Sequence, residues 1–176
     1  MRCRTILTAA AIGGCALALA ACGSSGTSGI ELAPSAGPTQ VSTPTTPKPP
    51  PALRTKPAVH VSPSSCSTKQ LVKQDLITGT GQTAQAGQTV TVNYVGVLCS
   101  NGKEFDSSWK RNQPFTTALS TGSIIPGWVQ GIPGMKVGGR RELIIPSNLG
   151  YGKTGQPPTI PPNATLVFVV DLLSIS

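Results

Sequence analysis

The sequence predicts a small α+β domain, an antiparallel sheet with one short helix, that follows a disordered tether rich in proline, serine and threonine. Three observations support this prediction. Nine of the 17 prolines lie between Pro34 and Pro63, so the excess belongs to a linker and not to the fold. Beyond residue 65, segments rich in β-branched residues alternate with turn residues, and a single short stretch carries helix signals.

The first half of the domain reads as strands and turns. We expect strands over Leu71–Thr78 and Thr89–Cys99, because valine and tyrosine alternate with threonine and asparagine in the second of them. Gly96 indicates a bulge inside that strand. Residues 100–102 (SNG) predict a turn, after which the chain returns through Phe105.

The second half contains the helix. Phe115–Leu119 predicts a short strand, and Pro126–Ile132 is the one helix candidate, since proline suits the first helical position and the following Pro-Gly pair ends the segment. Arg140–Ile145 and Thr165–Ile175 predict the last two strands. The final one is apolar on both faces, which is typical of a central, covered strand.

The N-terminus predicts export. Arg2 and Arg4 precede an apolar run over Ile6–Ala21, and about sixteen residues broken by two glycines is short for a membrane span. The sequence Leu19-Ala20-Ala21-Cys22 is similar to a bacterial lipobox, in which the cysteine is acylated and becomes the mature N-terminus. An ordinary secretory signal with an incidental cysteine is the alternative. The lipobox predicts anchoring by lipid to the outer face of the bacterial cytoplasmic membrane or cell envelope.

These patterns divide the chain into three parts. Residues 1–21 are predicted to be a lipoprotein signal peptide, residues 22–65 a lipid-anchored disordered linker, and residues 66–176 the folded domain. The linker has almost no large apolar residues, so it cannot bury enough surface to offset the entropy of ordering.

Cysteine usage and charge narrow the possible functions. Cys66 and Cys99 remain once the signal peptide is removed and Cys22 is acylated, and leftover cysteines in an exported protein are more often paired than free. Two reduced, buried thiols are the alternative. The spacing of the cysteines is unlike a metal site and the only histidine lies in the linker, so no metal or cofactor is expected.

The charge of the domain is spread out. The nine basic and five acidic residues within 66–176 form no basic stripe, which argues against nucleic-acid binding.

Three segments gather most aromatic residues of a chain that is only 4% aromatic around a single acid. They are Gly102–Trp109 (GKEFDSSW), Ile124–Gly134 (IIPGWVQGIPG) and Leu149–Phe168 (LGYGKTGQPPTIPPNATLVF). With the motifs YVG and MKVGGRRELIIP, they recur in the order and near the spacing of one family. Residues 70–176 therefore resemble an FKBP domain, the peptidyl-prolyl cis/trans isomerase family that also binds tacrolimus and rapamycin.

The resemblance implies a twisted sheet wrapped around the short helix, with a pocket between them. It also implies that the protein accelerates X-Pro bond rotation in exported proteins without covalent chemistry. The expected partners are proline-containing polypeptides and the two macrolides. The protein is expected to be a monomer that is attached to the membrane by its lipid anchor. Amide rotation faces a barrier of about 18 to 20 kcal/mol, and an apolar cavity that favours the twisted amide lowers it without nucleophile or metal.

The resemblance also implies residue roles. The indole of Trp128 would form the pocket floor, and Asp106 would lie at its rim, oriented by Tyr94 and Arg111. The hydroxyl of Tyr151 and the N–H of Ile125 would bind substrate carbonyls. The implied catalytic residues are Tyr94, Asp106, Trp128 and Tyr151. The implied substrate-binding residues are Phe105, Arg111, Phe115, Ile124, Ile125, Phe168 and, in the flap, Ile160.

Other interpretations remain open. Taken alone, Trp128 and Phe168 would be core residues and Asp106 with Arg111 a surface ion pair. A non-catalytic FKBP-like binding module at the cell surface is the alternative function, and an anchor whose working part is the tether is a third. Trp109 and the prolines of the flap depart from the common family pattern, so macrolide affinity is not predicted.

Overall fold

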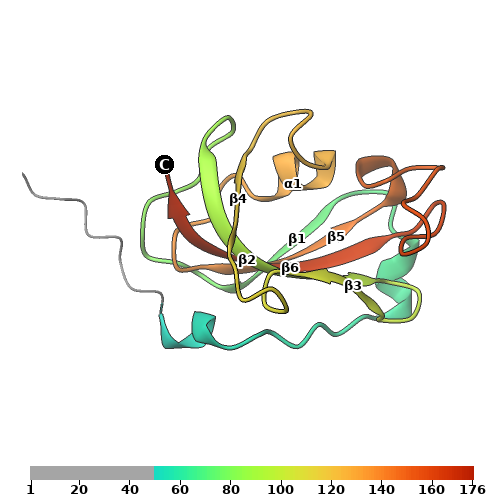
Figure 1. Cartoon of the computed structure of the whole chain (residues 1–176), viewed down its shortest axis with the longest axis horizontal. Helices are drawn as coiled ribbons and strands as arrows, with labels where there is room; N and C mark the ends of the chain where they lie inside the picture. The colour runs from blue at the N-terminus through green and yellow to red at the C-terminus, as the bar shows by residue number, and fades with distance from the viewer. Residues whose placement is uncertain (1–49) are drawn as a thin grey trace, which may run out of the picture. The chain divides into compact units, whose positions relative to one another are not determined.

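The computed structural model describes residues 50–176 (Figure 1). The predicted signal peptide, Cys22 and most of the predicted linker lie outside the described residues. Six strands, one α-helix and three 3-10 turns make up the described part. They are η1 (Pro51–Arg54), η2 (Pro63–Ser67), β1 (Val72–Ile77), β2 (Thr89–Leu98), β3 (Glu104–Ser107), β4 (Phe115–Ala118), α1 (Pro126–Gly131), β5 (Arg140–Ile145), η3 (Ser147–Leu149) and β6 (Leu166–Ile175).

The strands form one antiparallel sheet in the order β1-β5-β6-β2-β3, and β4 pairs with β2. The apolar strand β6 lies between β5 and β2, as its two covered faces predict. Helix α1 lies above the sheet in Figure 1. The predicted fold class, an antiparallel sheet with one short helix, is confirmed.

The expected bulge is present at Gly96. The register between β2 and β3 shifts between Gly96 and Val97. A Cβ atom at Gly96 would lie 2.7 Å from ring carbons of both Phe105 and Phe168, so only glycine lets these two rings approach the strand. The sequence did not predict β3 as a strand, because its four residues are too short to show a period.

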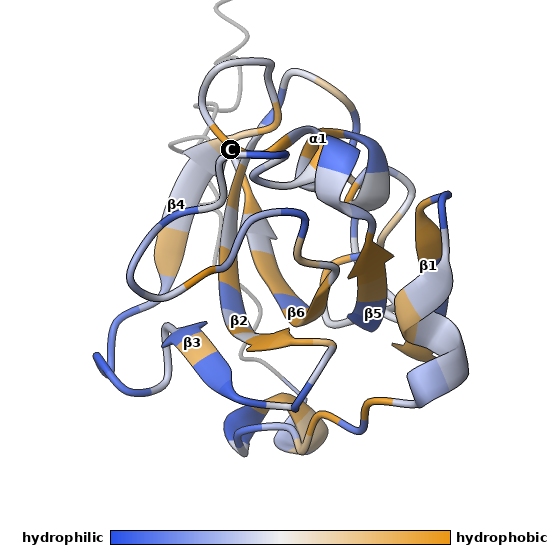
Figure 2. Cartoon of the chain, turned by 90° about the vertical axis from the view of Figure 1, so that its right-hand side faces the viewer, coloured by the Kyte–Doolittle hydropathy of each residue, from blue (hydrophilic) through white to orange (hydrophobic). Residues whose placement is uncertain are grey.

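The sheet has an apolar cluster on each face. Alternation along the strands separates them: Tyr94, Leu143 and Phe168 belong to the main core that includes Trp128 of α1. The second cluster lies on the other face, and it is formed by the residues in between, Val95, Val97, Cys99, Ile144 and Val167. Hydrophobic positions recur along β2, β5 and β6, as the orange bands in Figure 2 show.

Residues 50–67, which we name the strap, cover this second face and run below the sheet in Figure 1. Leu53 is only 2% exposed, and Val59 and Val61 pack against the second cluster. Arg140 of β5 donates a hydrogen bond to the carbonyl of Thr55 at 3.0 Å.

The expectation that the linker stays disordered to residue 65 therefore does not hold for residues 50–65. Three widely spaced apolar side chains, at positions 53, 59 and 61, are too few to show as a pattern in a proline-rich segment. They are nevertheless enough to seal an apolar sheet face that would otherwise meet water.

A disulfide bond joins Cys66 to Cys99, with their Cα atoms 5.5 Å apart. It links the end of the strap to the residue that follows β2. Thr165 adds a hydrogen bond from its hydroxyl to the carbonyl of Cys66 at 3.0 Å. No helix within residues 50–176 is long and apolar enough to cross a membrane.

Candidate active site

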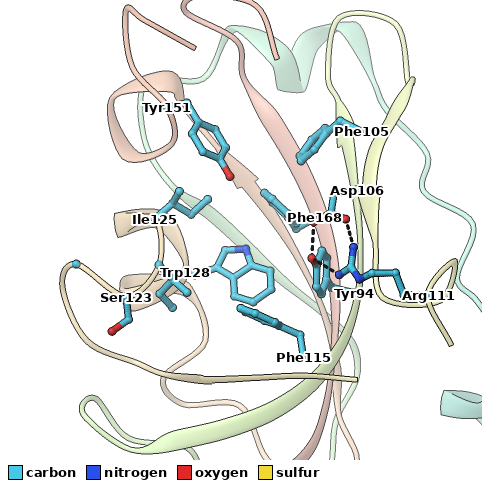
Figure 3. Close-up of a pocket in the computed structure, with 12 residues that line it drawn as sticks. Tyr94, Phe105, Asp106, Arg111, Phe115, Ser123, Ile125, Trp128, Tyr151 and Phe168 are labelled. Atoms are coloured by element: carbon cyan, nitrogen blue, oxygen red, sulfur yellow. Dashed lines mark hydrogen bonds and ion pairs between the residues drawn. The ribbon is translucent and has the colours of Figure 1, made fainter. Parts of the chain in front are cut away.

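A pocket of about 670 Å³ opens on the α1 side of the sheet (Figure 3). This volume is within the range of ordinary small-molecule sites. Its walls are mostly aromatic and aliphatic, with one carboxylate and one guanidinium group. The lining residues are Tyr94, Phe105, Asp106, Arg111, Phe115, Gly122, Ser123, Ile124, Ile125, Trp128, Tyr151 and Phe168.

Trp128 occupies the centre of the aromatic set. It is 4% exposed, and its ring centroid lies 5.2 Å from that of Tyr94 and 5.3 Å from that of Phe168. The interplanar angles of 85° and 83° are those of edge-to-face pairs, a favoured arrangement for aromatic rings. Helix α1 supplies Trp128 two residues after Pro126, so the proline that starts the helix also sets the place of the indole.

The remaining aromatic walls come from different strands. Phe105 of β3 meets Phe168 of β6 edge to face, with centroids 5.4 Å apart. Phe115 of β4 lies 5.9 Å from Tyr94 and is 37% exposed, so its ring forms part of the open side. The pocket thus depends on strands that are distant in sequence and adjacent in the sheet.

Asp106 is held by three donors. The hydroxyl of Tyr94 donates to Oδ2, while Arg111 and the backbone N–H of Ser107 donate to Oδ1. Arg111 also donates to the hydroxyl oxygen of Tyr94 at 2.8 Å, which closes a three-residue network. The side chains of Arg111 and Asp106 are 47% and 41% exposed, so the charged pair lies on the solvent-exposed side of the pocket.

The electrostatics settle the protonation states. Burial favours a higher pKa for Asp106, but the hydrogen bonds from Tyr94 and Arg111 outweigh burial, and the pKa lies below its usual value. Burial and the bond to Asp106 raise the pKa of Tyr94 to about 12. Near neutral pH, Asp106 is therefore an ionised acceptor and Tyr94 a protonated donor.

Two further polar groups in the pocket are available as hydrogen-bond donors. Burial, together with the charge of Asp106, raises the pKa of Tyr151, so its hydroxyl stays protonated and able to donate. The indole Nε1 of Trp128 is buried without a hydrogen-bond partner in the described part of the chain. Both are donors that a carbonyl-bearing ligand could satisfy.

The structure brings together ten of the eleven implied catalytic and substrate-binding residues. Ile160 is the exception: it is 3% exposed, packs in the main core and does not line the pocket. Its backbone instead pairs with Gln156 through two hydrogen bonds of 2.8 and 2.9 Å that close the flap loop. The role implied for Ile160, to shape the flap over the pocket, stays a prediction.

Sequence reasoning missed Gly122, Ser123 and Ser108. The first two line the pocket from a loop whose composition gives no chemical signal. Ser108 is fully buried, and its hydroxyl accepts a hydrogen bond from the backbone N–H of Tyr94 at 2.9 Å. The backbone N–H of Ser108 donates in return to the carbonyl of Tyr94, so Ser108 fixes the position of the tyrosine. Its place two residues after Asp106 was the available signal.

No group of three histidine, cysteine, aspartate or glutamate side chains that could hold a metal ion occurs within residues 50–176. The site offers apolar walls, directed donors and one fixed carboxylate. Such a set can bind and polarise a ligand, and it holds no activated nucleophile.

Comparisons with known proteins agree on one family. A family model described as FKBP-type peptidyl-prolyl cis-trans isomerase matches residues 80–173. The chain is 54% identical over 106 residues to the FK506-binding protein of Streptomyces anulatus, covering 60% of this chain and 86% of that protein. It is 52% identical over 92 residues to human peptidyl-prolyl cis-trans isomerase FKBP2, covering 52% of this chain and 64% of that protein.

A solved structure gives the same result. The crystal structure of FkpA from Escherichia coli matches with a TM-score of 0.56 and 45% sequence identity. The match covers 63% of this chain and 50% of the FkpA chain.

Proposed function

The chain belongs to the FKBP-type peptidyl-prolyl cis-trans isomerase family, and from this premise we propose that its aromatic pocket binds proline and accelerates X-Pro rotation in exported polypeptides. The chain is thus an isomerase. The observation that supports this role for the pocket is the position of the network of Asp106, Tyr94 and Arg111 at the edge of an aromatic cavity.

The chemistry needs little beyond that arrangement. The barrier to X-Pro rotation arises from amide resonance, which is lost as the bond twists. The twisted amide is less polar than the planar one, so a site that removes water from the carbonyl lowers the barrier. The proline ring would rest on the indole of Trp128, and the walls would exclude water from the reacting amide.

The polar groups would orient the substrate. The ionised carboxylate of Asp106 lies where it can interact with the twisting amide, and Tyr94 and Arg111 keep it from rotating. The backbone N–H of Ile125, the residue that caps α1, and the hydroxyl of Tyr151 would bind the carbonyls on either side of the bond. Binding that is tighter for the twisted than for the planar amide raises the rate.

We propose further that the enzyme works as a monomer at the cell surface. The sequence at residues 19–22 (LAAC) supports acylation of Cys22, and two acyl chains anchor a protein stably where one does not. Substrates would then be exported polypeptides that fold near the membrane. Tacrolimus and rapamycin would occupy the same pocket as the substrate proline.

A proline-isomerisation assay tests the proposal. The chain from residue 23 onward should accelerate X-Pro exchange, with a preference for a large apolar residue before proline, because Ile124, Ile125 and Phe115 border the pocket. A loss of the acceleration on addition of rapamycin would show that the macrolide and the substrate share the pocket. A rate equal to the uncatalysed control would refute the enzyme, and peptide binding without turnover would identify a binding module instead.

A further inference from the structure

In the connection between β3 and β4, three consecutive side chains contact three different parts of the domain. Trp109 packs against the second apolar cluster, the one that the strap covers. Lys110 forms a salt bridge with Oε1 of Glu104, at 2.9 Å. Arg111 reaches into the active site and binds Asp106 and Tyr94. This short turn therefore connects the strap side of the sheet with the pocket side.

Glu104 ties the strap to this turn. Its Oε2 accepts a bond of 2.6 Å from Lys56 of the strap, while Oε1 binds Lys110. Burial favours a higher pKa for Glu104, but the two lysines outweigh burial, and the pKa lies below its usual value. The carboxylate is therefore ionised and 18% exposed between two cations, and it belongs to β3 two residues before Asp106.

The backbone of the turn transmits these contacts to Arg111. The N–H of Arg111 donates to the carbonyl of Ser108 at 3.2 Å, and the N–H of Asn112 donates to the carbonyl of Trp109 at 3.2 Å. Asn112 has a φ of 49°, a conformation uncommon for residues other than glycine. These bonds close the turn around Arg111 and provide a path by which a shift of Trp109 or Lys110 can reach its guanidinium.

We propose that the strap is a positioning element of the isomerase site. Lys56, acting through Glu104 and Lys110, and Val61, acting through the second cluster against which Trp109 also packs, hold the turn that aims Arg111 at Asp106 and Tyr94. The inference rests on the proposed function, and it adds that residues 50–67 set catalytic efficiency although they do not line the pocket. A strap that only stabilised the fold would leave the geometry of Arg111 unchanged when its contacts are weakened.

Matched substitutions in the full-length chain separate the two roles. Lys56→Gln removes the strap cation, Lys56→Arg keeps it, and Lys69→Gln removes an exposed charge that makes no salt bridge among the described residues. Val61→Ser weakens the apolar contact, and Val72→Ser is its control, since Val72 is 40% exposed on β1. All four positions are outside the pocket lining, so each of the five variants should fold, which thermal unfolding verifies.

Two measurements are made on each variant. The first is kcat/KM for a proline peptide, for which we expect a fall of about two- to fivefold in Lys56→Gln, the range that one partly exposed ion pair can supply. The second is the ¹⁵N spectrum of the Arg111 guanidinium near neutral pH. Its nitrogens give separate signals while the group is held in place, and they merge when it rotates freely.

Faster rotation of Arg111 together with lower kcat/KM in Lys56→Gln and Val61→Ser, with Lys56→Arg and both controls like the wild type, supports the proposal. Arg111 signals that are unchanged in Lys56→Gln and Val61→Ser overturn it, whether or not turnover falls. A wild-type chain without turnover defeats the proposed function instead, and the Arg111 spectra alone then decide whether the strap positions the site.

Discussion

The hydroxyl of Tyr94 donates a hydrogen bond to the carboxylate of Asp106, twelve residues further along the chain and across the paired strands β2 and β3. Ser108 fixes the backbone of Tyr94, and Arg111 binds both side chains. The carboxylate is thus oriented by its surroundings before any substrate arrives, which spares the reaction the cost of ordering it.

The first prediction concerns this bond. Asp106→Ala should lower kcat/KM by about tenfold, equivalent to about 1.4 kcal/mol, because the carboxylate that faces the twisting amide is lost. Tyr94→Phe should have a smaller effect, since Arg111 and Ser107 still hold the carboxylate. Kinetics on both variants, with near-ultraviolet circular dichroism as the control for folding, check this. Full activity in Asp106→Ala would exclude the carboxylate from the reaction.

The second prediction concerns the titration of the tyrosines at alkaline pH. The chain has two tyrosines, and the pKa of both is raised, that of Tyr94 to about 12. A pKa higher in the folded than in the unfolded protein contributes stability that is fully present below about pH 10 and is lost as pH rises through about 12. Phenolate absorbance should therefore stay low near pH 10 in the folded protein and appear there in the urea-unfolded chain. Equal titration of both states would contradict the raised values.

The third prediction tests Gly96. Gly96→Ala would place a methyl group 2.7 Å from the rings of Phe105 and Phe168, so both pocket walls must shift and kcat/KM should fall severalfold. Gly87→Ala is the comparison: its φ of 84° strains an alanine, yet nothing lies within 4 Å of the added carbon. Both variants should lose about 1 kcal/mol or more of stability, whereas turnover per folded molecule should fall only in Gly96→Ala. A similar turnover in the two would separate the glycine from the pocket.

The fourth prediction concerns the disulfide. Replacing Cys66 and Cys99 by serine should lower the free energy of unfolding by roughly 3 to 4 kcal/mol in the chain-entropy account of a loop of this length, 33 positions. Urea unfolding with and without reductant measures the loss, and reductant should not affect the double variant. Thiol counting on protein exported by its native host provides the second check. Two free thiols there would leave only a pair of reduced cysteines.

The fifth prediction concerns the anchor. Cys22→Ala should leave either an unprocessed precursor or a soluble species, because acylation at that residue is what the sequence at residues 19–22 is expected to direct. Membrane fractionation and mass spectrometry of the first residue of the mature chain check this. Wild-type protein found chiefly in the culture medium, without lipid mass, would refute the anchor.

The sequence predicted the parts of this protein that repeat or cluster. The period of two in β2 and the continuous apolar run of β6 identified the sheet, and Pro126 with the later pair Pro133-Gly134 identified the helix. The aromatic residues of the pocket followed from motif order. These features depend on residues that are close together in the sequence, so the sequence pattern alone indicates them.

What the sequence missed depends on contacts between distant segments. The order of Val59 and Val61 within a proline-rich segment follows from an apolar sheet face that only the folded domain presents. Ile160 packs in the main core and its backbone closes the flap loop with Gln156, which no local pattern in the sequence indicates. The two lysine partners of Glu104 lie in separate parts of the chain, so no local pattern in the sequence indicates this pair of salt bridges.

The strap and the disulfide also define a mechanical path. Tension applied to the chain ahead of Pro50 would travel along the strap to Cys66 and cross the disulfide to Cys99 at the end of β2. The 66–99 segment, which includes the edge strand β1, is thereby bypassed by the covalent path. Without the disulfide, the same pull would reach β1 first, and that strand is held along one side by β5 alone. The crosslink thus moves the point at which such a load enters the sheet from the edge strand β1 to the end of the central strand β2.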